Sequence, residues 1–387
     1  MIKGSVKYKM AMANTACLYI IVGLTALLLV GCDDSDINLP GETPKSELTV
    51  EMRLQTLLND SVTTSDTPGA VMLIETPTRQ WVGASGLANT ALKTLMQPTD
   101  LLRIGSMTKP FVAVTVLKLI EEGKLCLDGK IRYILPDIVT GRITNGSEIT
   151  LRQLLDMTSG IYDYTESDAY NDSVENNPNR PKWGAEEVLE FSYDADADFY
   201  PGTGWQYSNT NYILLEMIIA KVSGSSLASE MHRVIHSPLG LKNTFMEIRE
   251  ARDGGFGGLL VRGYDEGEDI TEINDALGLG DGGLISDAKG LAQFLRGLLK
   301  DKTILSQASL NQMLEFHPTE DYGLGISKTQ TDFGIAWEHD GSTAGFEGSM
   351  VYLPEKEIIF VLLTNDFNSK LMDSLYKKAI GIIIEQH

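Results

Sequence analysis

Hydrophobic positions follow two different periods along this chain of 387 residues. Apolar residues three and four positions apart lie on one face of a helix, and they predict helices at 48–58, 151–157, 185–191, 212–222, 227–235, 288–299 and 370–384. Short apolar runs predict strands at 69–74, 80–83, 335–338, 349–353 and 358–364. Because strands occur at both ends, we expect one antiparallel sheet built from both chain ends and flanked by helices. A mostly helical insertion is expected at roughly 112–280.

The first 31 residues have a different pattern. Three lysines precede an almost uninterrupted apolar run, Ala16–Val30, which is the order found in secretory signals. The sequence Leu-Val-Gly-Cys at 29–32 resembles a bacterial lipobox, and the resemblance implies cleavage before Cys32 with lipid on its sulfur. An uncleaved transmembrane anchor is the alternative, although the run is short for a full span. We expect an exported, membrane-anchored lipoprotein facing the periplasm or cell surface, with a signal peptide at 1–31, a flexible linker at 32–47 and one domain at 48–387.

Composition narrows the possible partners. The chain carries 32 Lys+Arg against 53 Asp+Glu, a formal net charge of −21, which disfavours nucleic acid as a partner. Cysteine offers no disulfide framework, because Cys17 lies in the signal and Cys32 is the lipid site. Cys126 stands between Leu125 and Leu127, and we expect it to be a buried thiol. No coiled coil is indicated, so we expect a monomer.

Three serines are each followed three residues later by a lysine, so this spacing alone has little specificity; they are Ser106, Ser286 and Ser374. An apolar helical pattern follows Ser106 to about Ile120, and what singles out this pair must come from the rest of the chain. At a helix start, positions i and i+3 share a face, which would bring the Lys109 amine within reach of the Ser106 hydroxyl. A helix N-terminus also favours negative charge. Ser106 is therefore a candidate nucleophile.

A serine nucleophile needs a base and donors for the oxyanion. Tyr207-Ser208-Asn209 is the only Tyr-x-Asn in the chain, and in an extended segment Tyr207 and Asn209 would both face Ser106. A neighbouring ammonium lowers the pKa of a phenol, so Lys109 could favour the Tyr207 phenolate; a packing tyrosine is the alternative. The sequence has no G-x-S-x-G, H-E-x-x-H or Walker A motif. We expect no metal and no cofactor.

A third segment, His339-Asp340-Gly341-Ser342, ends a predicted strand. A strand passing the nucleophile would offer a backbone N–H to an oxyanion and a carbonyl to a substrate amide. Gly341 would let that backbone come close. His339 could donate a hydrogen bond, or supply a positive charge at lower pH.

The three segments, in this order and at these separations, resemble the motifs of the penicillin-recognising serine hydrolases. The nearest branch is the class C β-lactamase, DD-carboxypeptidase and family VIII esterase group. LLDMTSG at 154–160 and GGLIS at 282–286 also resemble phrases of that group. The resemblance spans roughly residues 48–385 and implies an α/β fold of the β-lactamase/transpeptidase type.

The resemblance implies a role for each residue. Ser106 would be acylated, and Lys109 would take or shuttle its proton and hold Tyr207 partly ionised. Tyr207 would act as general base and then protonate the leaving group. Asn209 would bind the substrate's amide and help to position Lys109.

The third motif departs from the commonest pattern of the family. β-Lactamases of this kind usually have Lys-Thr-Gly, whereas this chain has His339-Asp340-Gly341, which resembles certain DD-carboxypeptidases and esterases. The backbone N–H groups of Ser106 and Ser342 would form the oxyanion hole. His339 would face a substrate carboxylate, although Asp340 would add a negative charge beside that site.

The expected function is that of a serine hydrolase acting through a Ser106 acyl-enzyme. A D-alanyl-D-alanine carboxypeptidase-like activity is favoured, on a small peptide such as a peptidoglycan stem peptide. A carboxylesterase or a weak class C-like β-lactamase is the alternative within enzymes, with an ester or β-lactam as substrate. A non-catalytic penicillin-binding sensor or scaffold is the alternative of another class.

Overall fold

The computed structural model describes residues 49–250, 261–275, 278–367 and 369–385. The expected signal peptide, the lipidation site at Cys32 and the whole of the expected linker lie outside the described residues. The chain divides into a first unit that ends at Thr49 and a second unit, Val50–His387, which holds the fold described below. Within the described ranges no single helix is long and apolar enough to cross a membrane, although Thr210–Ser223 and Leu227–Leu239, bent by 75°, satisfy length and composition as a pair.

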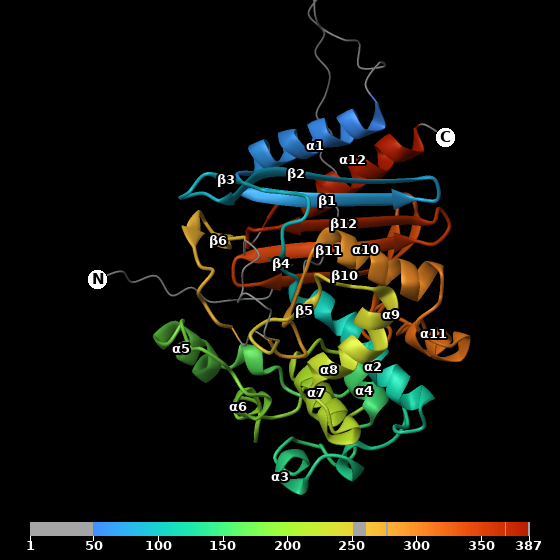
Figure 1. The fold of residues 1–387 in the computed structure, drawn as a ribbon. Helices are drawn as coiled ribbons and strands as arrows, with labels where there is room; N and C mark the ends of the chain where they lie inside the picture. Colours follow the sequence, from blue (N-terminus) through green and yellow to red (C-terminus); the bar gives the residue numbers. More distant parts are fainter. Residues whose placement is uncertain (1–48, 251–260, 276–277, 368, 386–387) are drawn as a thin grey trace, which may run out of the picture. The chain divides into compact units, whose positions relative to one another are not determined.

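A seven-stranded antiparallel sheet joins the two ends of this unit (Figure 1). Its strand order is β3-β2-β1-β12-β11-β10-β9, as the sequence predicted for a sheet built from both ends. The strands are β1 (Gly69–Thr76), β2 (Arg79–Asn89), β3 (Thr94–Leu95), β9 (Ser327–Thr331), β10 (Gly334–Thr343), β11 (Phe346–Leu353) and β12 (Ile358–Thr364). Every residue of β1 and β12 is buried, which explains why these strands read as continuous apolar runs rather than alternating ones.

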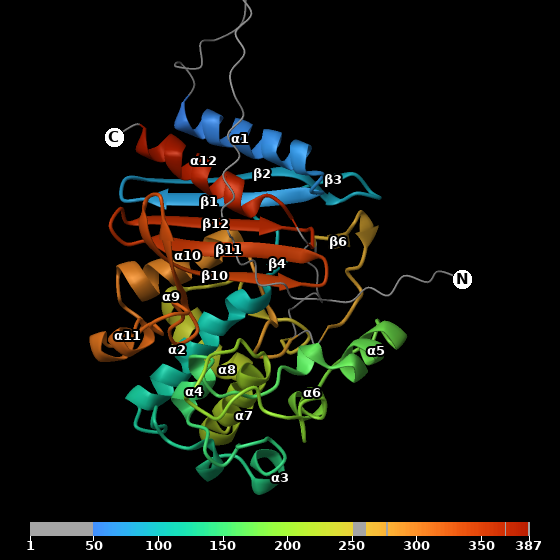
Figure 2. The ribbon, with the colours of Figure 1, turned by 180° about the vertical axis from the view of Figure 1, so that it is seen from behind.

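Helices cover both faces of this sheet, seen from opposite sides in Figures 1 and 2. Alternate residues of β1 enter different cores, so that Met72 packs with α1 (Val50–Ser65) and α12 (Met372–Ile384). Leu73 points the other way, into the core shared with α10 (Ala288–Leu295) and the helical region. This alternation is the two-residue period of a strand, and it fixes which face each residue of β10 presents.

The helical region is organised around α2 (Thr108–Glu121), whose first ten residues are all buried. A helix that is apolar on all sides is typical of the interior of a protein. Figures 1 and 2 show α2, α7 and α8 grouped on the β10 side of the sheet. The other helices and turns are α3 (Asp137–Thr140), α4 (Leu151–Leu155), α5 (Asp168–Asn176), α6 (Ala185–Leu189), α7 (Thr210–Ser223), α8 (Leu227–Met231), α9 (Ser237–Leu239), α11 (Gln307–Met313), η1 (Gly105–Met107), η2 (Ile131–Tyr133), η3 (Tyr164–Glu166), η4 (His232–His236) and η5 (Arg296–Lys300).

Two small sheets connect these layers. One has the order β4-β8-β5, and β6 pairs with β7 in the other. Their strands are β4 (Leu102–Arg103), β5 (Phe245–Met246), β6 (Tyr264–Asp265), β7 (Glu268–Asp269) and β8 (Leu284–Ser286). Strands this short leave no periodic pattern, so the sequence did not predict them. They matter because β4 leads directly into the turn that carries Ser106.

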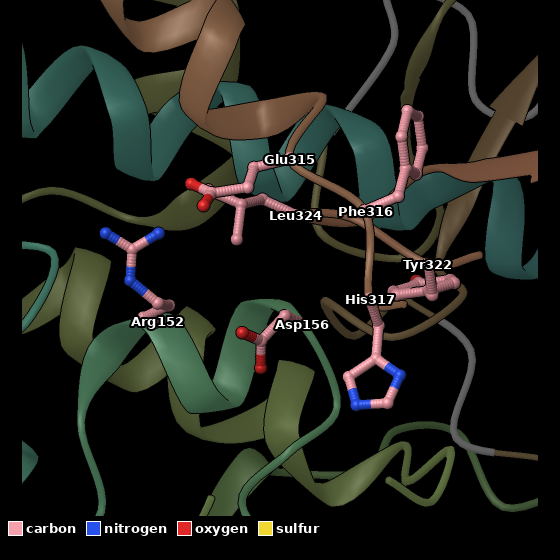
Figure 3. Close-up of a pocket in the computed structure, with 7 residues that line it drawn as sticks. All are labelled: Arg152, Asp156, Glu315, Phe316, His317, Tyr322 and Leu324. Carbon is pink, nitrogen blue, oxygen red and sulfur yellow. The ribbon is translucent and has the colours of Figure 1, made fainter. Parts of the chain in front are cut away.

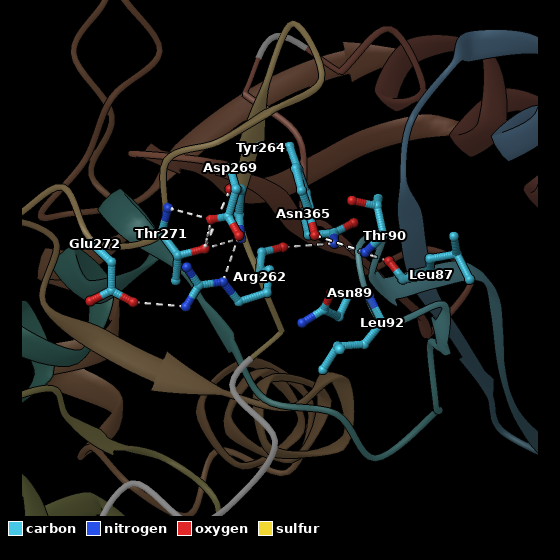
Figure 4. A network of polar contacts seen from close by, with 11 residues as sticks. Leu87, Asn89, Thr90, Leu92, Arg262, Tyr264, Asp269, Thr271, Glu272 and Asn365 are labelled. Carbon is cyan, nitrogen blue, oxygen red and sulfur yellow. Dashed lines mark hydrogen bonds and ion pairs between the residues drawn. The ribbon is translucent and has the colours of Figure 1, made fainter.

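A network of polar contacts ties the end of β12 to the rest of the unit (Figure 4). Asn365 donates to the carbonyl oxygens of Leu87 at 3.1 Å and Arg262 at 2.8 Å. Arg262 also pairs with Asp269 and Glu272, each at 2.7 Å. The network joins β2, the β6–β7 hairpin and the segment after β12, so it is structural rather than part of the site described below.

One expectation about the core is wrong. Cys126 is an exposed thiol, not a buried one. Its neighbours Leu125 and Leu127 are buried, at 9% and 8% exposure, so the short segment between α2 and η2 presents alternate residues to the core and to solvent. The sequence showed the apolar neighbours but not this alternation.

Candidate active site

Ser106 lies in the 3-10 turn η1, immediately before α2. Lys109 occupies the first turn of α2, and its Nζ donates to Ser106 Oγ at 2.9 Å. The i, i+3 spacing therefore places both groups on one face, as expected from the sequence. The Ser106 side chain is partly exposed while Lys109 is fully buried. A substrate can reach the hydroxyl, and the amine behind it is shielded from water.

Lys109 has three acceptors. Its Nζ donates to Ser106 Oγ, to Asn209 Oδ1 at 2.8 Å and to the Asp281 carbonyl oxygen at 2.6 Å. These use all three protons of an ammonium. Burial lowers the pKa of Lys109 to about 8, although the carboxylates of Asp281 and Asp163 act in the opposite direction. Near neutral pH a minority of molecules therefore hold a neutral amine that can accept a proton from Ser106.

Asn209 connects Lys109 to a buried carboxylate. Its Oδ1 accepts from Lys109, and its Nδ2 donates to Asp163 Oδ2 at 2.9 Å. The segment before α7 is a loop, and Asn209 itself has a helical backbone conformation, so it reaches the site as the residue that precedes α7 and not as part of an extended segment. The structure thus gives Asn209 a part in holding Lys109, while its contact with a substrate amide stays a prediction.

Tyr207 lies across Lys109. The Lys109 Nζ is 4.9 Å from the centre of the Tyr207 ring, and the phenol is hydrogen-bonded to Ser106. Burial raises the pKa of Tyr207 well above its usual value; Tyr322 adds to this, and the hydrogen bond with Ser106 acts against it. The expectation that Lys109 holds Tyr207 partly ionised is therefore not supported, and the phenol is neutral in the resting site.

The strand β10 passes directly against the Ser106 turn. A Cβ atom on Gly341 would lie 2.0 Å from the carbonyl oxygen of Ile104 and 2.9 Å from the backbone nitrogen of Ser106. A Cβ on Gly105, which has a φ of 51°, would lie 2.7 Å from the backbone nitrogen of Ser342. Only glycine fits such an approach. The two expected oxyanion donors, the N–H groups of Ser106 and Ser342, therefore belong to facing segments.

The edge of β10 is open beside the nucleophile. β9 pairs with β10 only as far as Glu338, so among the described residues no strand lies beyond the part of β10 from His339 onward. An open edge offers backbone donors and acceptors to an extended substrate. The expected docking of a substrate amide on this strand is geometrically feasible.

His339 is buried, with 5% of its surface exposed. Its Nδ1 lies 2.6 Å from the Asp340 carbonyl oxygen and its Nε2 lies 3.1 Å from the Tyr322 hydroxyl. Burial and the charge of Lys109 lower the pKa of His339 to about 3. The ring is therefore neutral, and its expected role as a cation that faces a substrate carboxylate stays a prediction that this geometry does not favour.

Asp340 lies on the other face of β10. Ala336 belongs to the core under α1 and α12, and residues at even positions of the strand share that face. The side chain of His339 and a Cβ added at Gly341 point to the helical side instead. The expected negative charge beside the substrate site is thus directed away from it.

Three residues of the site were not predicted from the sequence. Asp163 accepts from Asn209, and Tyr164 donates to Asp281 Oδ2 at 2.7 Å. Burial raises the pKa of Asp281 to about 6, and the nearby Lys109 opposes this. All three stand in turns without any distinctive spacing, so only the folded chain brings them to Lys109.

Tyr322 also lines a cavity of about 210 Å³ (Figure 3). Polar side chains line it, among them Arg152, Asp156 and His317. Arg152 is held by Asp128 at 2.7 Å and by Gln312 at 2.8 Å. In the described part of the chain no group of three His, Cys, Asp or Glu residues could hold a metal ion.

The beta-lactamase family model matches residues 54–380. The chain therefore belongs to the beta-lactamase family, within the penicillin-recognising serine hydrolases. The resemblance seen in the three motifs and the expected fold class are both confirmed.

Individual relatives differ in what they do. Penicillin-binding protein 4* of Bacillus subtilis (strain 168) is 27% identical over 327 residues, which cover 78% of this chain and 69% of the relative. Esterase EstB of Burkholderia gladioli is 31% identical over 166 residues, covering 41% of this chain and 42% of the esterase. The crystal structure of a D-stereospecific amidohydrolase from Streptomyces sp. has a TM-score of 0.73 and 29% identity, with 85% of this chain and 97% of that chain covered.

A further neighbour supports the fold alone. D-Amino acid amidase from Ochrobactrum anthropi SV3 has a TM-score of 0.75 at 24% identity, covering 87% of this chain and 99% of that chain. Together these comparisons establish a hydrolase of the beta-lactamase family and leave its substrate open.

Proposed function

We propose that this chain hydrolyses amide bonds next to a D-amino acid through a Ser106 acyl-enzyme. This is the chemistry of a D-alanyl-D-alanine carboxypeptidase or of a D-amino acid amide hydrolase. The observation that carries the proposal is the buried Lys109 Nζ 2.9 Å from an accessible Ser106 hydroxyl, with Gly341 against the same turn. The likeness to the D-stereospecific amidohydrolase and to penicillin-binding protein 4* supports the substrate class.

The proposed reaction has two halves. In the first, neutral Lys109 takes the Ser106 proton, the Oγ–carbon bond forms, and the N–H groups of Ser106 and Ser342 stabilise the oxyanion. The carbon–nitrogen bond then breaks as neutral Tyr207 gives its proton to the leaving nitrogen, and the Lys109 proton returns to the phenol. In the second half a water molecule takes the place of the amine, which releases the acid and restores the Ser106 hydroxyl.

The test is a set of small amides that differ only in chirality. We expect amides and N-acylated dipeptides of D-alanine to be turned over with a kcat/KM at least tenfold above that of the L forms, and Ser106→Ala to abolish turnover. Ser374→Ala is the matched control, because Ser374 also precedes a lysine by three residues but lies exposed on α12. Equal turnover of both enantiomers would contradict the proposed substrate class.

A carboxylesterase is the second candidate, and its support is the 31% identity with esterase EstB over 166 residues. The same Ser106 acyl-enzyme would serve both reactions. Short acyl esters measured beside the D-amides decide between them: turnover of esters alone would favour the esterase. Acylation by a β-lactam, with turnover of neither the D-amides nor the esters, would favour the penicillin-binding sensor.

A further inference from the structure

Two side chains of β10 stand on either side of Gly341 on the face toward the nucleophile. They are His339 and Thr343, both buried, at 5% and 9% exposure. A residue two positions along a strand points the same way, so these are the β10 side chains placed to meet a group bound beyond the oxyanion hole. What each can offer to that group depends on the partners it already has.

His339 has no ring N–H available to donate to a substrate. The carbonyl oxygen of Asp340 can only accept, so the proton is on Nδ1, and Nε2 accepts from the Tyr322 hydroxyl. The titratable groups that face the ring in the described part of the chain are Tyr322 and Lys109, and the positive charge of Lys109 opposes a second proton on the ring. His339 is thus a neutral ring with both nitrogens engaged inside the protein.

The Thr343 hydroxyl also has a hydrogen-bond partner inside the protein. It lies 3.0 and 2.9 Å from the two carboxylate oxygens of Asp275, which also accepts from the Ala344 backbone nitrogen at 2.9 Å. The hydroxyl proton is therefore directed at Asp275. The carboxylate of Asp275 also places negative charge at this end of the strand. The charge of Arg103 offsets part of it, and the remainder disfavours a second anion nearby.

Two cations lie close to the nucleophile turn. Lys109 donates to three acceptors, so binding a carboxylate at Lys109 would require one of these hydrogen bonds to break. Arg103 of β4 makes two hydrogen bonds with Glu247, at 2.9 and 3.0 Å, through Nε and Nη2. Its Nη1 has no hydrogen-bond partner among the described residues, but the whole side chain is buried with its guanidinium over the ring of Phe346.

We propose that the leaving-group end of the site selects an uncharged group, a carboxamide or an ester, over a free carboxylate. The inference rests on the proposed Ser106 acyl-enzyme and refines its substrate class. A carboxylate that leaves water needs charged or strong donors in return, and the inward-facing side chains of β10 provide none. A neutral carboxamide loses less hydration and is not repelled by Asp275. Tyr322 acts as a positioning residue, because its hydroxyl holds the neutral form of His339.

A matched pair of substrates tests this selectivity. N-Acetyl-D-alanyl-D-alanine and its C-terminal carboxamide share the scissile bond and differ in the terminal charge. We expect the carboxamide to have a kcat/KM at least about tenfold higher, the scale expected when a buried charge lacks a partner. The ratio should stay constant from pH 5.5 to 8. A preference for the free acid, or a gain in free-acid turnover below pH 6.5, would overturn the inference.

Variants separate a neutral His339 from a cationic one. His339→Asn keeps a donor near the position of Nδ1 but cannot become charged, so the carboxamide-to-acid ratio should stay within about twofold of the native ratio. Selective loss of free-acid turnover would show that a charged His339 binds the carboxylate. Tyr322→Phe removes the donor to Nε2, and the free acid should gain at least threefold relative to the carboxamide between pH 8 and pH 5.5. No such gain would refute the role of Tyr322.

Tyr376→Phe is the control for the loss of a tyrosine hydroxyl, because Tyr376 packs in the core on the opposite face of the sheet. It should leave the ratio unchanged at every pH. Turnover and intact mass measured with each substrate separate a failure of the proposed function from a failure of the selectivity. An enzyme that shows neither turnover nor an acyl adduct with either substrate would overturn the proposed function, whereas turnover of both with the free acid preferred would overturn only the selectivity.

Discussion

At the scale of single residues, Lys109 is held between opposing electrostatic effects. Burial lowers its pKa, and the nearby carboxylates of Asp281 and Asp163 raise it, with a result of about 8. Tyr207 differs, because burial raises its pKa and its phenol stays protonated. Lys109 is thus the group suited to accept the first proton, and Tyr207 is suited to give one to the leaving group.

The pKa of Lys109 makes a testable prediction for Asp281→Asn. Removing this negative charge lowers the pKa of Lys109 further, because the ammonium loses a stabilising neighbour. The rising limb of kcat/KM against pH should therefore move to lower pH, by about half to one unit. Asp332→Asn, which removes a surface carboxylate paired with Lys377, should not move the limb. An unchanged or more alkaline limb in Asp281→Asn would mean that another group is the base.

Tyr207→Phe should affect amides and activated esters unequally. An amide nitrogen must be protonated to leave, so its acylation should slow by roughly two to four orders of magnitude. A 4-nitrophenyl ester of the same acyl group needs no proton on its leaving oxygen, and it should slow by less than about tenfold. Pre-steady-state acylation rates measure both. An equal loss for the two substrates would indicate that Tyr207 activates Ser106 instead.

The sequence predicted some of these residues and not others for a physical reason. Ser106 and Lys109 are joined by helical spacing, which is local and can be read directly. Asp163, Asp281 and Tyr322 come from separate loops, and tertiary packing alone brings them together. The state of Tyr207 was misjudged for the same reason, since its pKa depends on burial that a motif does not reveal.

At the scale of elements, the site is the contact between the η1 turn and the open edge of β10. The contact is so close that Gly341 has no room for a side chain. The strand leaves its neighbour β9 after Glu338, so its backbone faces the nucleophile instead of another strand. This arrangement converts the edge of a sheet into one wall of the site.

Gly341→Ala should therefore damage catalysis more than stability. The added methyl group would push β10 away from the Ser106 turn and displace one oxyanion donor, so acylation should fall by about 10²–10³-fold. Gly381→Ala is the matched control, because a Cβ there would meet no atom within 4 Å and the residue lies within α12. It should leave the rate unchanged. Comparable acylation by Gly341→Ala would contradict the proposed oxyanion hole.

Elements with a clear pattern of apolar residues were predicted well. β12 runs over Ile358–Thr364 as expected, and α7 extends the expected helix by two residues at its start and one at its end. The expected helices at 227–235 and 288–299 instead change into π-helical turns, η4 and η5. Such changes in winding depend on packing and leave the apolar spacing intact. The edge strand β9, with its polar sequence SKTQT, had no apolar signal to find.

At the scale of the whole described unit, the two ends of the chain meet in the sheet and the middle supplies the helices. β1 and β12 pair directly, with Leu73 opposite Val361. Ser106 comes from the helical side and Gly341 from the sheet, so the site forms only when the distant ends have paired. A lipid anchor at Cys32, an extracytoplasmic location and a monomeric state stay predictions.

The pairing of the two ends predicts how a core mutation acts. Leu73 is fully buried in the sheet, so Leu73→Ala should reduce the free energy of unfolding by about 2–5 kcal/mol. Urea denaturation measures this loss. Leu92→Ala is the control, since Leu92 is 76% exposed, and it should change stability by less than about 0.5 kcal/mol. A loss below 1 kcal/mol for Leu73→Ala would argue that this strand is not part of the central core.

The most direct test of the account is intact-mass labelling with a fluorescent penicillin and, separately, with a fluorophosphonate. We predict one covalent adduct per chain from each reagent, mapped by proteolysis to Ser106, absent in Ser106→Ala and retained in Ser374→Ala. Adducts on another serine, or no adduct from either reagent on the folded native chain, would contradict the claim that Ser106 is the nucleophile.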